Sequence, residues 1–298
     1  MVGTKTLAGI SIFLALNGCS PSGSKHSIKV GSKNFTEQVI LGEIIAQHLD
    51  RRLKAPIERR LNLGGTLLAH QALLAGEIDL YPEYTGTALT AILKQPVTSA
   101  PADVLAQVRS AYLKQFQTEW LDPLGVDNGF AMVVQGAEAR SMNLETLSDA
   151  ARFMDRWSLG VGYEFEQRPD GLPALTKTYG FQWKGRPRSM DLGLLYAALQ
   201  QGQVKMIAAN ATDGLLSNLD LRVLRDDRHA FPPYEVAVAV RQDSLRGTPG
   251  LREALLELSG KFTNSAMQKL NQQVDGEHRS VAEVARGFLK AAKLDVDR

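Results

Sequence analysis

Hydrophobic and polar positions follow two different periods near the start of the chain. Ile28 and Val30 alternate with polar neighbours, which predicts a half-buried strand that ends in a turn at 31–33. From 40 to 49 the apolar residues lie three and four positions apart, which predicts a helix with one buried face. Asn34 and Glu37, three residues apart, have the form of a capping box at its start. Strand, turn and helix in this order open an α/β fold.

The same alternation continues to the end of the chain. Further strands are predicted at 57–63, 78–81, 130–134, 158–162, 204–208, 221–224 and 236–240. Further helices are predicted at 66–75, 104–116, 192–200, 251–258, 264–274 and 281–292. Strands that alternate with helices indicate parallel sheets, and we expect a second parallel sheet in the second half.

This order of elements predicts an α/β fold with two lobes joined by two hinge strands. We expect lobe 1 at 28–128 and 234–298, with the terminal helices packed on it, and lobe 2 at 129–233. A chain that leaves one α/β lobe, builds a second and returns encloses a cleft between them. Clefts at the ends of sheet strands bind ligands.

The start of the chain predicts export and a lipid anchor. Residues 7–16 carry no charge and are mostly apolar, a stretch too short for a bilayer, which needs about 20 residues, but typical of an export signal. Cys19, the only cysteine, follows small residues as in a bacterial lipobox. We therefore expect a signal peptide at 1–18, a lipid on Cys19 and a tether at 19–27, which place the protein outside the cytoplasm or in the periplasm. A plain secretory signal with an incidental cysteine is the alternative.

Composition and charge exclude several classes of function. The chain is 44% hydrophobic and 22% charged, and its net charge of +2 argues against a nucleic-acid partner. Its five histidines lie far apart without the spacing of metal ligands, and one cysteine allows no internal disulfide. The sequence holds neither a nucleophile elbow nor a phosphate loop. We therefore expect no catalytic residue, no metal and no cofactor.

Four segments resemble the osmoprotectant-binding proteins of ABC importers. They are GSKNFTEQ at 31–38, DLYPEYTGT at 79–87, TDG at 212–214 and FPPY at 231–234. The resemblance covers nearly all of the chain after the signal and implies a type II periplasmic-binding-protein fold. It implies a monomeric receptor that hands glycine betaine, choline or carnitine to a permease driven by a separate ATPase. The membrane is then contacted only through the lipid anchor.

The resemblance also implies an aromatic cage. A quaternary ammonium has charge but no N–H donor, so it is held by ring faces rather than by hydrogen bonds. Relatives that bind betaine have four cage tyrosines; here Tyr84 and Tyr234 are retained, whereas Phe130 and Asn210 replace the other two. Asn210 has no ring but brings a donor and an acceptor. Either betaine binds weakly in an incomplete cage, or the site is retuned for another small polar or amino-acid-like solute.

The carboxylate of such a solute needs donors from the cleft. By resemblance and by their place near a helix start, the candidates are Ser32, Lys33, Asn34, Thr87 and, from lobe 2, Arg168. A surface arginine paired with Glu164 or Glu166 is the alternative for Arg168.

A second class of function remains open at this stage. A periplasmic enzyme or a sensory module on the same clamp fold would need a reactive group in the cleft or an attached signalling domain. The sequence shows neither feature. A receptor, by contrast, must release its solute unaltered.

Overall fold

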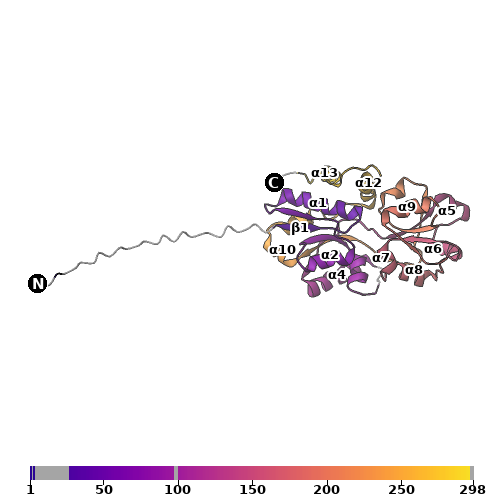
Figure 1. Ribbon diagram of the computed structural model, residues 1–298, viewed down its shortest axis with the longest axis horizontal. Coiled ribbons are helices and arrows are strands. Elements are labelled where there is room, and N and C mark those ends of the chain that lie inside the picture. Colours follow the sequence, from indigo (N-terminus) through magenta and orange to yellow (C-terminus); the bar gives the residue numbers. More distant parts are fainter. Residues whose placement is uncertain (2, 4–26, 97–99, 296–298) are drawn as a thin grey trace.

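The chain forms two α/β lobes that lie side by side (Figure 1). The computed structural model describes residues 1, 3, 27–96 and 100–295. The predicted signal peptide, Cys19 and nearly all of the tether therefore lie outside the described residues. Within those residues no helix combines the length and the apolar character needed to cross a membrane.

The first lobe is built on a five-stranded sheet. Its strands, in spatial order, are β2 (Ile57–Arg60), β1 (Ile28–Gly31), β3 (Leu80–Tyr84), β10 (Val236–Arg241) and β4 (Thr118–Trp120). β1 runs parallel to β2 and β3, whereas β10 runs antiparallel to β3 and β4. The strand that returns from the second lobe thus completes the sheet of the first.

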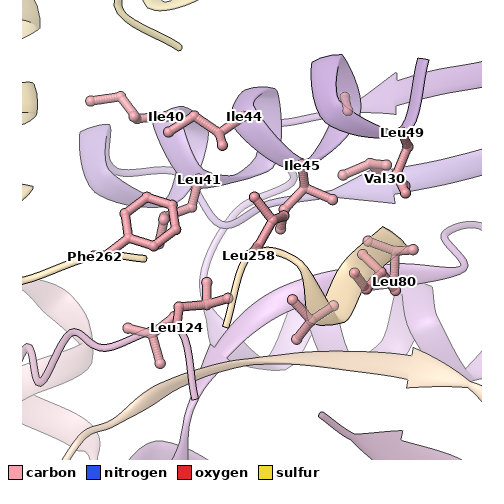
Figure 2. Close-up of a cluster of buried hydrophobic side chains, with 14 of the residues drawn as sticks. Val30, Ile40, Leu41, Ile44, Ile45, Leu49, Leu80, Leu124, Leu258 and Phe262 are labelled. Carbon is pink, nitrogen blue, oxygen red and sulfur yellow. The ribbon is translucent and has the colours of Figure 1, made fainter. Parts of the chain in front are cut away.

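Helices cover both faces of this sheet. They are α1 (Thr36–Arg52), α2 (Thr66–Leu74), α3 (Thr85–Thr87), the π-helix η1 (Ala88–Ile92), α4 (Pro101–Phe116), α10 (Gln242–Gly247), α11 (Leu251–Leu256), α12 (Asn264–Asp275) and α13 (Val281–Ala291). Alternate residues of β10 enter different cores: Val236 and Val238 pack with α1, and Ala237 packs with α2 and α4. Figure 2 shows α1 lying over the first core. The terminal helices α11, α12 and α13 pack on α1, as predicted.

The second lobe has its own five-stranded sheet. In spatial order its strands are β7 (Arg188–Ser189), β6 (Leu159–Val161), β8 (Met206–Asn210), β5 (Phe130–Gln135) and β9 (Leu221–Leu224). The helical segments are α5 (Gly136–Met142), α6 (Leu147–Ala150), η2 (Ala151–Phe153), α7 (Tyr163–Gln167), α8 (Leu172–Tyr179), α9 (Leu192–Gln200) and η3 (Gly214–Ser217). α9 covers one face, and α5, α6 and α8 cover the other.

The two segments that connect the lobes run next to each other. Asp127 and Glu235 form an antiparallel bridge, and the N–H of Asn128 donates to the carbonyl of Tyr234 at 3.1 Å. The two-lobed α/β fold with paired connections is confirmed. The strands of each sheet fall inside the predicted lobe limits of 28–128 with 234–298 and 129–233, and the limits themselves stay a prediction.

Three local predictions were wrong. The second sheet is mixed rather than parallel, because β5 starts at the connection, where β8 ends, and so runs antiparallel to β8. The first helix has Phe35 rather than Asn34 at its N-cap and no side-chain cap, because Glu37 is buried and bonded elsewhere. β3 extends to Tyr84 instead of ending at Tyr81, which carries Tyr84 to the boundary between the lobes.

Candidate functional site

A cavity of about 490 Å³ lies between the two lobes and is lined by both. Below we call it the interlobe cavity. Eight of the nine predicted ligand-binding residues line it: Lys33, Asn34, Tyr84, Thr87, Phe130, Arg168, Asn210 and Tyr234. Ser32 does not. Its buried hydroxyl donates to the carbonyl of Lys33 and accepts from the N–H of Asn62 at 2.9 Å, so it stabilises the turn instead.

The four cage positions share one structural origin, the ends of strands. Tyr84 is the last residue of β3, Phe130 the first of β5 and Asn210 the last of β8, and Tyr234 lies two residues before β10. These ends face the boundary between the sheets, where α/β folds bind ligands. Segments far apart in sequence therefore meet at one cavity.

Tyr84 is held in place from two sides. Its hydroxyl donates to Oε1 of Glu37 at 2.7 Å, and its ring stacks on Phe35 with 6.1 Å between centroids. The Nζ atom of Lys33 lies 4.8 Å from the centroid of the Tyr84 ring. Burial raises the pKa of Tyr84 well above its ordinary value, and the phenol stays neutral.

The charge of Lys33 is neutralised inside the first lobe. Its Nζ donates to Oε1 of Glu83 at 2.5 Å and to Oγ1 of Thr66 at 3.2 Å. The side chains of Lys33 and Glu83 are 2% and 0% exposed. Lys33 thus lines the interlobe cavity as half of a buried ion pair, not as a free cation.

Arg168, directly after α7, pairs mainly with a carboxylate that the sequence analysis did not single out. Its Nε and Nη2 donate to the two oxygens of Asp170 at 3.0 and 2.5 Å, and Nη2 also donates to Oγ1 of Thr87 at 2.9 Å. Of the two partners in the alternative interpretation, Glu164 lies 3.5 Å away and Glu166 accepts instead from a serine of β7. Arg168 therefore joins lobe 2 to Thr87 of lobe 1.

Asp170 is fully buried and has side-chain partners besides Arg168. Besides Arg168, it accepts the hydroxyl of Tyr234 at 2.6 Å. Burial alone raises the pKa of Asp170, but the charge and the hydrogen bonds of Arg168 outweigh burial and hold this pKa below its ordinary value. The buried pair thus stays ionised and fixes both Arg168 and Tyr234.

The aromatic wall is shared with the guanidinium of Arg168. Its Cζ atom lies 5.1 Å from the centroid of the Phe130 ring and 5.9 Å from that of Tyr234. The two rings meet edge to face with 5.5 Å between centroids. A solute cation must therefore use the ring surface that Arg168 leaves open.

A second contact between the lobes involves Glu164 of α7. Its carboxylate accepts the N–H of Thr66 at 2.5 Å and the Thr66 hydroxyl at 3.0 Å, at the N-terminus of α2. Burial raises the pKa of Glu164, but Lys33 and Arg168 outweigh burial, so the pKa lies below its ordinary value. Glu164 and Asp191 both line the interlobe cavity, so its wall carries two carboxylates beside the two cations.

Asn210 is fixed by a carboxylate behind it. Oδ2 of Asp213 accepts the backbone N–H of Asn210 at 3.1 Å and the hydroxyl of Tyr196 at 2.8 Å, and Oδ1 accepts Nδ2 of Asn210 at 3.3 Å. Burial raises the pKa of Asp213. These contacts make Asp213 a structural carboxylate that holds Asn210 and Tyr196.

Glu37 is a site-forming residue that sequence reasoning missed. It is 2% exposed and accepts hydrogen bonds from Tyr84 (2.7 Å), Nδ2 of Asn128 (2.9 Å) and the hydroxyl of Thr212. Burial raises the pKa of Glu37. A signal was present, because Glu37 precedes Ile40 by three residues and so lies on the apolar face of the helix.

The fold and the cavity define a solute-binding protein of the two-lobed periplasmic type. The family described as the substrate-binding domain of the ABC-type glycine betaine transport system matches residues 26–291, and the chain belongs to this family. A crystal structure of a glycine betaine/carnitine/choline ABC transporter protein is similar, with a TM-score of 0.76 and 31% identity over 90% of this chain and 99% of that one.

Two curated relatives show how closely the chain resembles transport proteins. The carnitine transport binding protein OpuCC of Listeria monocytogenes is 32% identical over 93% of this chain and 92% of its own length. The ergothioneine transport permease/ergothioneine binding protein EgtU of Helicobacter pylori is 33% identical over 89% of this chain and 47% of its own length. These relatives are transport proteins, which agrees with the expectation that the chain is not an enzyme. Among residues 27–96 and 100–295, no three or more His, Cys, Asp or Glu side chains are grouped to hold a metal.

Proposed function

We propose that this chain captures a small methylated ammonium compound in the interlobe cavity and delivers it, unaltered, to an ABC permease driven by its ATPase. The observation that carries the proposal is the convergence of three aromatic residues, Tyr84, Phe130 and Tyr234, on one cavity between two lobes. Each ring contributes about 0.5–2 kcal/mol to the binding of such a cation. Glu164 and Asp191, the carboxylates of the lining, add attraction for positive charge.

The carboxylate of a betaine or carnitine has a separate set of donors. Thr87 and Asn34 line the cavity on the first lobe, and Arg168 reaches it from the second with one side of its guanidinium bonded to Asp170. We propose that these three groups hold the anionic end. Lys33 is not one of these groups, because its ammonium is bonded to Glu83.

Calorimetric titration tests the proposed ligand class. Glycine betaine, choline, carnitine and proline betaine are compared with a panel of unmethylated amino acids, and we expect only the methylated cations to bind. Tyr84→Ala and Tyr234→Ala should each weaken binding at least about tenfold. Tyr179→Ala serves as the control, because Tyr179 is also buried but lies outside the cavity lining.

Two results contradict this assignment. One is normal binding by both alanine variants at unchanged melting temperature. The other is a preference of the wild-type protein for unmethylated amino acids. Mass spectrometry of the released solute checks the transport role, since any chemical change in it points to an enzyme.

We further propose that Cys19 carries a lipid and that residues 19–27 tether a monomeric receptor to the outer face of a membrane. The lipobox-like run before Cys19 supports this proposal. Cys19→Ser should move the protein from the membrane fraction to the soluble fraction, whereas an unchanged distribution contradicts the anchor. Light scattering of the released form should give the mass of one chain.

A further inference from the structure

The side-chain amide of Asn210 has a fixed orientation. Asp213, directly behind it, receives three donors: the backbone N–H of Asn210, the Nδ2 of Asn210 and the hydroxyl of Tyr196. Nδ2, the donor end of the amide, lies 3.3 Å from Oδ1 of Asp213, so the NH₂ end of the amide faces this carboxyl group. The amide oxygen therefore points to the other side.

That oxygen is available to a solute. Within the described part of the chain, Oδ1 of Asn210 accepts no hydrogen bond, and it is not one of the buried side-chain atoms without a partner. The residue is half-buried and lines the interlobe cavity. Asn210 thus brings an acceptor without a partner among the described residues to the lining of the interlobe cavity.

The acceptor lies next to an aromatic ring. Asn210 and Phe130 are directly opposite each other in the antiparallel pair of β8 and β5. Residues paired in this way have side chains on one face of the sheet, with Cβ atoms about 4.5–5.5 Å apart. The amide of Asn210 and the ring of Phe130 are therefore neighbours on one face of the sheet, so that one short solute can contact both.

We propose that Asn210 selects solutes with a hydroxyl or N–H donor about two carbon atoms from the methylated ammonium, and disfavours those without one. The inference rests on the proposed function and deepens it. When the lobes enclose the solute, the amide oxygen loses water and must regain a donor. An unsatisfied acceptor weakens binding about 5- to 150-fold.

Two matched pairs of solutes test this selection by calorimetry. Carnitine is compared with its deoxy analogue, which lacks the hydroxyl, and choline is compared with its methyl ether. We expect the wild-type protein to bind the hydroxyl-bearing member of each pair about 5- to 150-fold more tightly. Asn210→Ala should remove this difference, mainly by tightening the binding of the member without the hydroxyl, because no acceptor is then left unsatisfied. Asn218→Ala, at an exposed asparagine of the same lobe outside the cavity lining, should preserve it.

The outcomes separate the inference from the proposed function. Equal binding of both members of each pair by the wild-type protein overturns the selection by Asn210 and leaves the methylated-cation receptor intact. A uniform loss of affinity for all four solutes in Asn210→Ala also overturns it, because the residue is then only part of the wall. Absence of binding for all four solutes in the wild-type protein refutes the proposed function, and the inference with it. The wild-type comparison requires no variant to fold.

Discussion

Replacing Arg168 with methionine removes one partner of the buried ion pair between Arg168 and Asp170. Asp170 is 0% exposed and keeps only the neutral hydroxyls of Tyr234 and Thr90 as side-chain partners. Arg168 is 11% exposed and borders the cavity. The carboxylate left by Arg168→Met therefore cannot reach water. The guanidinium left by Asp170→Asn can reach it and also keeps Thr87.

This asymmetry sets the expected magnitudes. Leaving a buried charge without its partner costs about 3–5 kcal/mol, so Arg168→Met should lower the free energy of unfolding by that amount. The corresponding fall in melting temperature is about 6–20 °C for a protein of this size. Asp170→Asn loses a charge-assisted pair but leaves no charge buried away from water. It should lower the free energy of unfolding by only about 1–2 kcal/mol.

Denaturant unfolding of the solute-free proteins measures these differences. The double variant Arg168→Met with Asp170→Asn should be more stable than Arg168→Met alone, because the stranded carboxylate is gone. An Asp170→Asn variant that is destabilised as much as Arg168→Met refutes the reasoning. A double variant whose loss of stability equals the sum of the two single losses also refutes it.

The pH dependence provides a second check on the same pair. The pKa of Asp170 is lower in the folded protein than its ordinary value of 3.8. Its contribution to stability is therefore present above that value and is lost as the pH falls through the folded-state pKa. The gap in stability between wild type and Asp170→Asn should shrink on acidification below about pH 4. A gap that stays constant from pH 7 to pH 3 contradicts this assignment.

Three further predictions address the cavity and its closure. Phe130→Leu should weaken choline binding about 2- to 30-fold but weaken binding of the neutral isostere 3,3-dimethylbutanol less. Phe231→Leu is the control, because Phe231 belongs to the same aromatic cluster but lies outside the cavity lining. Equal losses of affinity for choline and for the isostere in Phe130→Leu contradict a cation–π role. Asn210→Tyr should tighten the binding of glycine betaine by a similar factor, as measured by calorimetry. Weaker binding by this variant contradicts the assignment of residue 210 to the aromatic cage. Glu164→Gln should weaken the contact with Thr66 and increase the radius of gyration of the solute-free protein in X-ray scattering. Glu166→Gln should leave this radius unchanged, because Glu166 is bonded within the second lobe. Equal radii for wild type and Glu164→Gln contradict a role of this contact in holding the lobes together.

Patterns local in sequence predicted much of the fold and most of the cavity lining. Alternation of strands and helices predicted the two lobes. The resemblance located Tyr84, Phe130, Asn210 and Tyr234, which all lie at or near strand ends. Strand ends are marked by turn residues and motifs that a sequence displays directly.

The partners of these residues were harder to predict because distant segments supply them. Lys33 was expected to be a cationic donor to the solute carboxylate, but the parallel pairing of β1 with β3 brings Glu83 to it from 50 residues away. The antiparallel direction of β5 depends in the same way on where β8 ends. Pairings of this kind are fixed by tertiary packing, which no local period encodes.

The single carboxylate of Glu37 has a mechanical consequence. It holds the cavity tyrosine Tyr84, the connecting residue Asn128 and Thr212, which follows β8 of the second sheet. Rotating one lobe away from the other must break at least one of these bonds in a place that water does not reach, so intermediate angles are disfavoured. We expect the two lobes to switch between a few discrete relative orientations, each with its own position of the Tyr84 side chain.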